Sequence, residues 1–186
     1  MSLNPLAVAQ LPLLADLLEY PSAGYFDHVE RTRAALAVDF PAIALALEPL
    51  AVFAAESDQA VWEERFTRTF DIAAPCCLEI GWQLFGENYH RGELLVKLRV
   101  ALREYGVDEG TELPDHLVPV LRLIAKLPPE MVPEDLAHDG ILPALQKMHA
   151  SLAPDENPWA CVLVAVEELL LCAYGPAEAP MEVMEV

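Results

Sequence analysis

The chain has 186 residues, and 54% of them are apolar, so it can bury one sizeable core and is not disordered as a whole. Its 30 acidic residues outnumber 11 basic ones, and the net charge of −19 argues against binding to nucleic-acid phosphates or to an anionic lipid surface. The same charge either attracts a basic peptide or simply keeps an apolar helical protein soluble, and composition favours neither interpretation.

Apolar residues recur three and four positions apart and do not alternate at a period of two, a pattern that predicts helices and no strand. The first predicted helix ends at Tyr20, because a residue before proline, here Pro21, avoids helical backbone angles. Helices are next predicted over 25–38 and 41–53, followed by one that Asp58 caps. The apolar face of that capped helix consists of Val61, Trp62, Phe66, Thr69 and Phe70.

A less regular stretch over 72–86 precedes the clearest amphipathic helix, which is predicted over 92–105 and ends where Gly106 stops it. The apolar stripe of this helix consists of Leu94, Leu95, Leu98, Ala101, Leu102 and Tyr105. After a polar loop, Asp115 is expected to cap the next helix, and Pro119 is tolerated there because it falls in the first turn.

Two further helices are predicted near the C-terminus. One covers 135–152, with a break or bend at Gly140 and Pro143. The other starts with Asn157 as its N-cap and Pro158 at its first helical position. This last helix is apolar nearly all round, which predicts that it is central and buried.

Together these elements predict an all-α protein, a single-domain helical bundle over 1–174 with a flexible acidic tail over 175–186. We find no internal repeat and no domain linker. The longest apolar stretch near the C-terminus, 159–166, is shorter than the roughly 20 residues that a membrane span requires, so direct membrane insertion is not expected. No secretory signal is recognisable at the N-terminus.

The four cysteines predict neither a disulfide framework nor a metal site. Cys161 and Cys172 share one predicted helix and lie about 16 Å apart along it, which is too far for a disulfide. Cys76 and Cys77 are adjacent rather than separated by two residues, as they would be in a zinc or redox motif. Reduced thiols are the simplest account, and they predict a cytoplasmic protein.

The sequence contains no recognisable set of catalytic residues. It has no phosphate-binding loop, HExxH or GxSxG motif. A di-metal carboxylate bundle needs its Glu-x-x-His motif twice, whereas this chain has it once, at Glu87 and His90. We therefore predict no enzymatic activity, no metal and no cofactor. A helical metal- or cofactor-binding enzyme that uses Glu87, His90 and His116 is kept as an alternative, as is a scaffold protein with an unrelated partner.

Three segments combine residues in unusual ways. In 66–71, an aromatic pair at helical spacing ends with Phe70 and is followed by Asp71. The segment 112–117 lies in a loop that leads into a helix, and loops held by a rigid scaffold are where recognition residues tend to lie. Charged residues between two glycines make up 86–92. Each segment also has a structural interpretation, as a core stripe, a helix start or a turn.

The chain resembles the NarJ family in the order and spacing of these three segments and of Leu17-Leu18-Glu19-Tyr20-Pro21. Its members are delta-subunit assembly chaperones of respiratory nitrate reductase and are kin to the TorD and DmsD chaperones of molybdoenzyme maturation. The resemblance is strongest over 112–117. The chain differs from nitrate reductase members at His90, where they usually carry an acidic residue. It also lacks the long C-terminal extension that is typical of those members. These departures leave the identity of the client enzyme open.

The resemblance implies a TorD/NarJ-like helical fold and a non-catalytic cytoplasmic role. Such a chaperone binds the N-terminal peptide of the apo catalytic subunit of a molybdoenzyme, here respiratory nitrate reductase or a relative, while molybdenum cofactor and iron–sulfur clusters are inserted. Aromatic residues would contact the apolar side of that peptide, and acids would meet its basic groups. The residues assigned to this binding region are Phe70, Asp71, Trp82, Phe85, Glu87, Tyr89, Arg91, Glu112, Pro114, Asp115 and His116. A homodimer is left open.

Overall fold

The computed structural model describes residues 3–71, 76–128, 131, 135–152 and 157–176. Within these ranges the secondary structure is helical, and the β pairing is confined to an isolated antiparallel bridge between Glu79 and His116. No helix of the described ranges is both long and apolar enough to span a membrane. The predicted all-α fold is confirmed.

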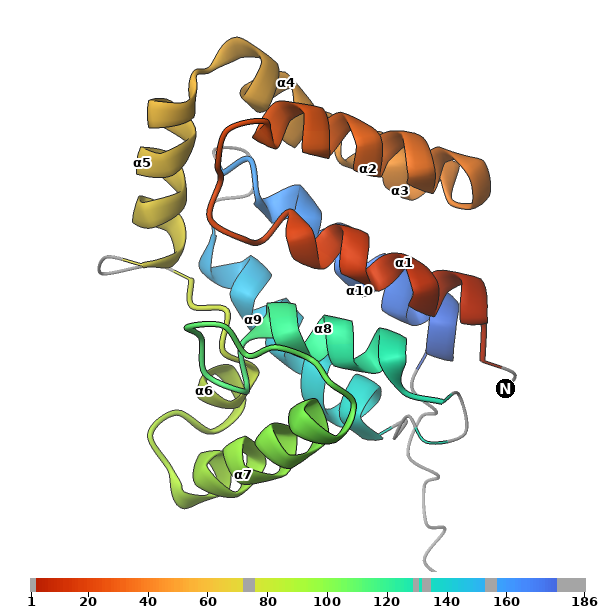
Figure 1. The fold of residues 1–186 in the computed structure, drawn as a ribbon, viewed down its shortest axis with the longest axis vertical. Helices are drawn as coiled ribbons and strands as arrows, with labels where there is room; N and C mark the ends of the chain where they lie inside the picture. The colour runs from red at the N-terminus through yellow and green to blue at the C-terminus, as the bar shows by residue number, and fades with distance from the viewer. Residues whose placement is uncertain (1–2, 72–75, 129–130, 132–134, 153–156, 177–186) are drawn as a thin grey trace, which may run out of the picture.

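Two helices from opposite ends of the chain pack against each other in the middle of the fold (Figure 1). They are α1 (Pro5–Asp16) and α10 (Ala160–Tyr174). On one side, α8 (Leu117–Lys126) packs against α1. On the other side, α2 (Tyr25–Asp39) lies next to α1 and carries the short helices that follow it.

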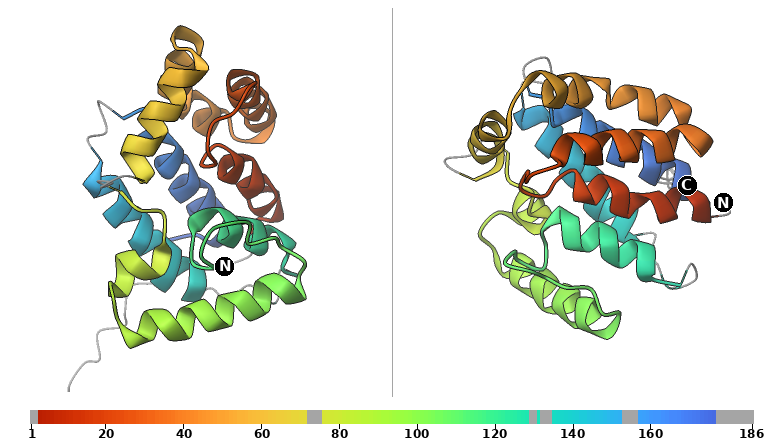
Figure 2. Two further views of the ribbon diagram at one scale, coloured as in Figure 1. Left: turned by 60° about the vertical axis from the view of Figure 1, so that its left-hand side comes forward. Right: turned by 45° about the horizontal axis from the view of Figure 1, so that its top comes forward.

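Those short helices are α3 (Pro41–Ala46) and α4 (Glu48–Glu56), and both contact α2 and α10. Next in the chain, α5 (Gln59–Phe70) stands at one edge of the molecule and runs across the direction of α1 and α2 (Figures 1 and 2).

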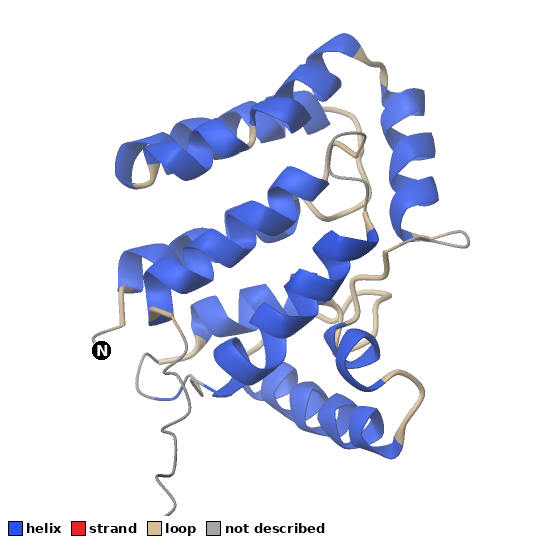
Figure 3. Cartoon of the chain, turned by 180° about the vertical axis from the view of Figure 1, so that it is seen from behind, coloured by secondary structure: helices blue, strands red, loops and turns tan. Residues whose placement is uncertain are grey.

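The remaining helices form the opposite end of the molecule, which Figure 3 shows from behind. There α6 (Ile80–Phe85) packs against α7 (Tyr89–Glu104) and α9 (Leu142–Ser151), and α7 also contacts α8. A π-helical turn, η2 (Leu136–Ile141), leads directly into α9. The predicted break or bend in 135–152 corresponds to the change from η2 to α9, and Pro143 falls in the first turn of α9.

The last helix is central and buried, as predicted. Most of the surface of α10 is shielded from solvent, including Val162, Leu163, Ala165, Val166, Leu169 and Leu170, whereas Leu171 and Cys172 near its end are exposed. Asn157 does accept the N–H of Trp159 through its side chain at 3.0 Å, but the helix begins at Ala160 rather than at Pro158. The cap therefore closes a turn that precedes α10.

Trp159 connects the helices of the upper half of the core. It is fully buried, and its ring lies within 5.4–6.2 Å, between centroids, of four aromatic rings, those of Tyr25, Phe53, Phe66 and Phe70. Its indole Nε1 donates to the carbonyl of Leu17 at 3.1 Å and to the Tyr25 hydroxyl at 2.8 Å. Buried polar groups need such partners, so this cluster holds the α1–α2 connection against α5 and α10.

One predicted helix, over 41–53, is in fact two. The prediction is wrong because Pro49 cannot donate a backbone hydrogen bond inside a helix and is accommodated instead in the first turn of a new one. The chain ends α3 at Ala46, turns at Leu47 and restarts as α4, which extends to Glu56.

The prediction of irregular structure over 72–86 is wrong for residues 80–85, which form α6, while 72–75 lie outside the described residues. The amphipathic helix predicted over 92–105 begins three residues earlier, at Tyr89. Asn88 explains this start, because its side chain accepts the N–H of His90 at 3.2 Å and so caps α7. Most of the predicted tail, 177–186, also lies outside the described residues.

We expect Trp159→Phe to lower the free energy of unfolding by about 2 kcal/mol, because two buried hydrogen bonds from Nε1 are lost and a small cavity is left. Urea unfolding followed by circular dichroism measures the change. The matched control is Trp82→Phe at a ring that is 46% exposed, for which we expect a change within about 0.5 kcal/mol. Equal changes for the two variants would show that Trp159 does not have this role.

Candidate functional site

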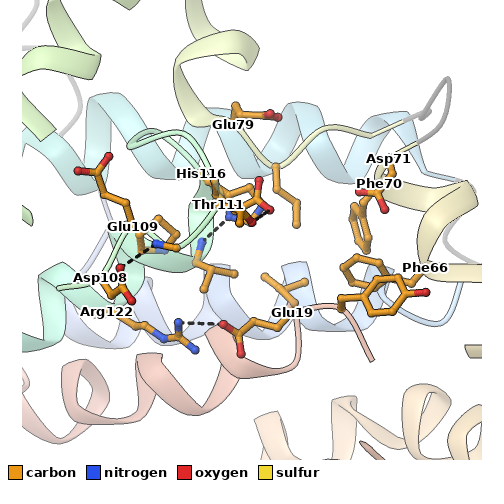
Figure 4. Close-up of a pocket in the computed structure, with 17 residues that line it drawn as sticks. Glu19, Phe66, Phe70, Asp71, Glu79, Asp108, Glu109, Thr111, His116 and Arg122 are labelled. Atoms are coloured by element: carbon orange, nitrogen blue, oxygen red, sulfur yellow. Dashed lines mark hydrogen bonds and ion pairs between the residues drawn. The ribbon is translucent and has the colours of Figure 1, made fainter. Parts of the chain in front are cut away.

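A cavity of about 530 Å³ opens where five parts of the chain meet (Figure 4). Its walls come from the α1–α2 connection, the C-terminal end of α5, the segment 78–79 before α6, the loop over 108–112 and the first turns of α8. Apolar side chains form part of the lining, namely Leu18, Phe66, Phe70, Leu78 and Val118. A ligand in this cavity would therefore be able to bury some apolar surface.

The charged residues of the cavity are mostly acids. Among the described residues, six carboxylates line it, those of Glu19, Asp71, Glu79, Asp108, Glu109 and Glu112, against one guanidinium, that of Arg122. Arg122 pairs with Glu19 at 2.9 Å, and Glu109 pairs with Arg99 at 3.0 Å. Within the described part of the chain, the other four carboxylates have no ion-pair partner.

The carboxylates on one side of the cavity affect each other's charge. The pKa of Asp71 is raised above its usual value by partial burial and, next in size, by the negative charge of Glu112, while His116 acts in the opposite direction. A cation placed between Asp71 and Glu112 would relieve this repulsion. The cavity is therefore prepared for a positively charged group.

His116 lines the cavity without contributing a positive charge at neutral pH. Burial lowers the pKa of its imidazole, although four neighbouring carboxylates partly oppose this effect. Its Nδ1 accepts the N–H of Val118 at 3.3 Å, so His116, and not Asp115, is the N-cap of α8. The prediction that Asp115 caps this helix is wrong.

Asp115 points into the protein instead. It is fully buried, and its carboxylate accepts hydrogen bonds from Nε and NH2 of Arg91 at 2.8 and 3.3 Å. A Cβ on Gly81 would lie 2.6 Å from the Asp115 Oδ2, so the backbone of α6 comes this close only because residue 81 is glycine. The Arg91 guanidinium also lies 5.4 Å from the centre of the Trp82 ring.

Backbone hydrogen bonds also join the segment at the start of α6 to the segment at the start of α8. The amide of Ile80 donates to the carbonyl of Asp115 and the amide of Leu117 donates to the carbonyl of Leu78, both at 2.8 Å. The start of α6 is thereby held against the start of α8. Glu79 and His116, which face each other in this bridge, both line the cavity.

The eleven residues assigned from the sequence form two groups, with three residues in the contact between them. Phe70, Asp71, Glu112 and His116 line the cavity. Exposed positions on α6, on α7 and in the turn between them form a separate group, which we call the aromatic surface: Trp82, Phe85, Glu87 and Tyr89. The buried residues Pro114 and Asp115, with Arg91, lie in the contact that links these two regions.

Four acids of the cavity were not assigned from the sequence. Glu19 falls in the recognised segment 17–21, so a signal for it was present. Glu79, Asp108 and Glu109 lie outside the singled-out segments, and nothing in their local sequence indicates that they converge.

The residues of the metal alternative lie in different surroundings. Glu87 and His90 are exposed where α7 begins, and the His90 Nδ1 is 3.5 Å from Glu93. His116 is instead half-buried beside the cavity. In the described residues, no three side chains among His, Cys, Asp and Glu are grouped so that they could hold a metal ion. The four cysteines are free thiols.

These features define a class of protein: an all-helical protein whose cavity suits a ligand that is basic and partly apolar. The chain belongs to the nitrate reductase delta subunit family, because the sequence pattern of that family matches residues 35–165. The predicted resemblance to the NarJ family is confirmed by this match.

The chain is also similar to curated relatives. Two proteins named nitrate reductase molybdenum cofactor assembly chaperone NarJ, from Escherichia coli strain K12 and from Escherichia coli O157:H7, are each 29% identical to it over 159 residues. The alignment covers 81% of this chain and 65% of each relative, so the chain spans slightly less than two thirds of their length.

We expect Asp115→Asn to lower the free energy of unfolding by about 3 kcal/mol, because the guanidinium of Arg91, only 16% exposed, is left without a counter-charge. Urea unfolding provides the measurement. The control is Glu64→Gln, which breaks an exposed ion pair with Arg68 and should change stability by less than about 0.5 kcal/mol. A loss at Asp115 no larger than the loss at Glu64 would contradict the role given to the buried pair.

Proposed function

We propose that this chain is a cytoplasmic assembly chaperone that binds the N-terminal peptide of the apo catalytic subunit of a nitrate reductase or a related molybdoenzyme and assists its maturation and cofactor insertion. Family membership and the names of the curated relatives support the chaperone role. The observation that carries the proposal is the cavity, in which four carboxylates without ion-pair partners in the described chain surround an apolar lining.

The chemistry of the cavity matches a peptide that carries basic side chains on an apolar helix. A lysine or arginine side chain would place its charged end among the carboxylates and its methylene groups against Phe70 and Leu78. The overall charge of −19 would speed the encounter with such a peptide. The cavity has the volume of a typical small-molecule pocket, so it would hold a few side chains and not the whole peptide.

The aromatic surface is the region where the rest of the peptide would bind. Trp82, Phe85 and Tyr89 are 46%, 43% and 77% exposed, which is unusual for three large rings close together in the chain. The surface is connected to the cavity along the chain, because Glu79 lines the cavity and directly precedes α6, which carries Trp82 and Phe85. An amphipathic peptide would lay its apolar side on these rings, with Glu87 near its basic groups.

The titratable groups near the cavity support binding and not catalysis. Burial raises the pKa of the Cys76 and Cys77 thiols to about 11, so both are protonated and weakly nucleophilic at neutral pH. The Nδ1 of His116 is already occupied by the backbone N–H of Val118. We therefore assign the chain no enzymatic step, no metal and no cofactor of its own.

The charge contribution can be tested with calorimetry. We expect the double variant Asp71→Asn, Glu112→Gln to bind a synthetic peptide from the N-terminus of a nitrate reductase catalytic subunit about tenfold more weakly than the wild type, because two charges that meet the peptide are removed. The control, Glu56→Gln with Glu104→Gln, alters the net charge equally at exposed sites outside the cavity and should change the affinity less than twofold.

Added salt should weaken binding to the wild type more than binding to the cavity variant. Equal losses in the cavity variant and the control would contradict the assigned site. If the peptide does not bind the wild-type chain at low salt, the proposed function is wrong and a scaffold with another partner becomes the better hypothesis.

The aromatic surface predicts a loss of a different kind. We expect Phe85→Ser with Tyr89→Ser to weaken peptide binding about tenfold at every salt concentration, because apolar contact is not screened by ions. Val38→Ser with Leu45→Ser removes apolar groups of comparable exposure from α2 and α3 and should leave the affinity unchanged. Unchanged binding in the α6–α7 variant would remove this surface from the proposal.

A further inference from the structure

Arg122 lies in the wall between the cavity and a second, smaller hollow. The second hollow has a volume of about 310 Å³ and is lined by the α1–α2 connection together with residues of α1 and α2. Glu19, Tyr20 and Arg122 line both spaces. The wall therefore contains the one arginine among the residues that line the cavity in the described chain.

The guanidinium of Arg122 divides its contacts between the two sides of this wall. Its NH1 is 2.9 Å from Glu19, a residue of the cavity, and its NH2 donates to Asp16, which lines only the second hollow. The dashed line in Figure 4 marks the contact with Glu19. The side chains of Arg122, Asp16 and Glu19 are 31%, 33% and 51% exposed, so water and ions reach this group.

The two contacts have different consequences for a cationic ligand. Glu19 faces the cavity but is neutralised by Arg122, and Arg122 itself repels a second positive charge. If the ion pair with Glu19 broke, Arg122 would remain paired with Asp16. The second hollow offers space for the guanidinium on that side. An incoming cation therefore needs to break only the outer, more exposed contact.

We propose that Arg122 is an internal counter-ion that competes with the ligand for Glu19 and thereby lowers the affinity of the cavity for cationic side chains. This inference rests on the proposed function, because it concerns the same cavity. Arg122 acts as a specificity-determining residue: a ligand with one isolated charge displaces it poorly, whereas a ligand with several basic groups meets the other carboxylates at the same time.

The test uses two peptides and the full chain. The first is an acetylated, amidated octapeptide of alternating arginine and leucine, and the second is the N-terminal peptide of a nitrate reductase catalytic subunit. We expect Arg122→Gln to bind both about fourfold more tightly than the wild type, by calorimetry at low salt. Arg33→Gln is the matched control: it removes the same charge from a residue outside the cavity, one that pairs with Glu30 and Glu48, and it should bind like the wild type.

Two further variants separate competition from a structural role of the ion pair. Asp16→Asn leaves Arg122 with Glu19 as its remaining partner and should weaken binding, whereas Asp39→Asn, an exposed change of the same charge, should not. Glu19→Gln should weaken binding more in the Arg122→Gln background than in the wild type. Urea unfolding of each variant confirms that the compared proteins are folded.

The outcomes for the two proposals differ. If the octapeptide follows this pattern but the catalytic-subunit peptide does not bind, the inference stands and the proposed function fails. If the catalytic-subunit peptide binds with an affinity that Arg122→Gln leaves unchanged or weakens, the inference is overturned and the function stands. Failure of both peptides to bind the wild type and Arg122→Gln overturns the inference as well.

Discussion

The candidate site depends on a buried ion pair between Asp115 and Arg91. A carboxylate at full burial is tolerated only with a charged, hydrogen-bonded partner, and Arg91 of α7 provides two hydrogen bonds. This requirement keeps α7 against the start of α8 and, through the close approach of Gly81, holds α6 there as well. His116 follows Asp115 directly in the chain, so the ion pair also determines where the His116 imidazole lies in the cavity wall.

Local placement of charge matters more for this cavity than the total of −19. Salt at physiological strength screens charges beyond about 8 Å, so most surface carboxylates act only on the approach of a ligand. The acids around Asp71 and Glu112 act at contact distance and beside apolar groups, where water competes less. The overall negative charge and the local carboxylates of the cavity thus favour the same kind of ligand, a basic and partly apolar peptide.

Helices were predictable where local rules decide them, and errors arose where one local rule was overlooked or a distant contact prevailed. Pro49 and Asn88 carried the signals for the restart at α4 and for the early start of α7, and both signals are local. Asp115 is different, because its tendency to cap a helix was overridden by Arg91, which lies 24 residues away in the chain.

The candidate site was predictable in part for the same reason. Phe70, Asp71, Glu112 and His116 belong to segments whose order and spacing identify the family, and they do line one cavity. Glu79, Asp108 and Glu109 belong to no such segment. Their convergence follows from the way in which α6, the loop over 108–112 and α8 pack together.

The sequence by itself determined the helical class, the negative charge and the family, because periodicity, composition and the order of motifs can all be read from the linear chain without knowing which distant residues touch. Only the tertiary structure decided that Asp115 faces inward, which carboxylates have no ion-pair partner in the described chain, and that Arg122 lies between Asp16 and Glu19. The physical reason is distance along the chain: Arg122 and Asp16 are 106 residues apart, and such pairs form only when packing brings separate helices together.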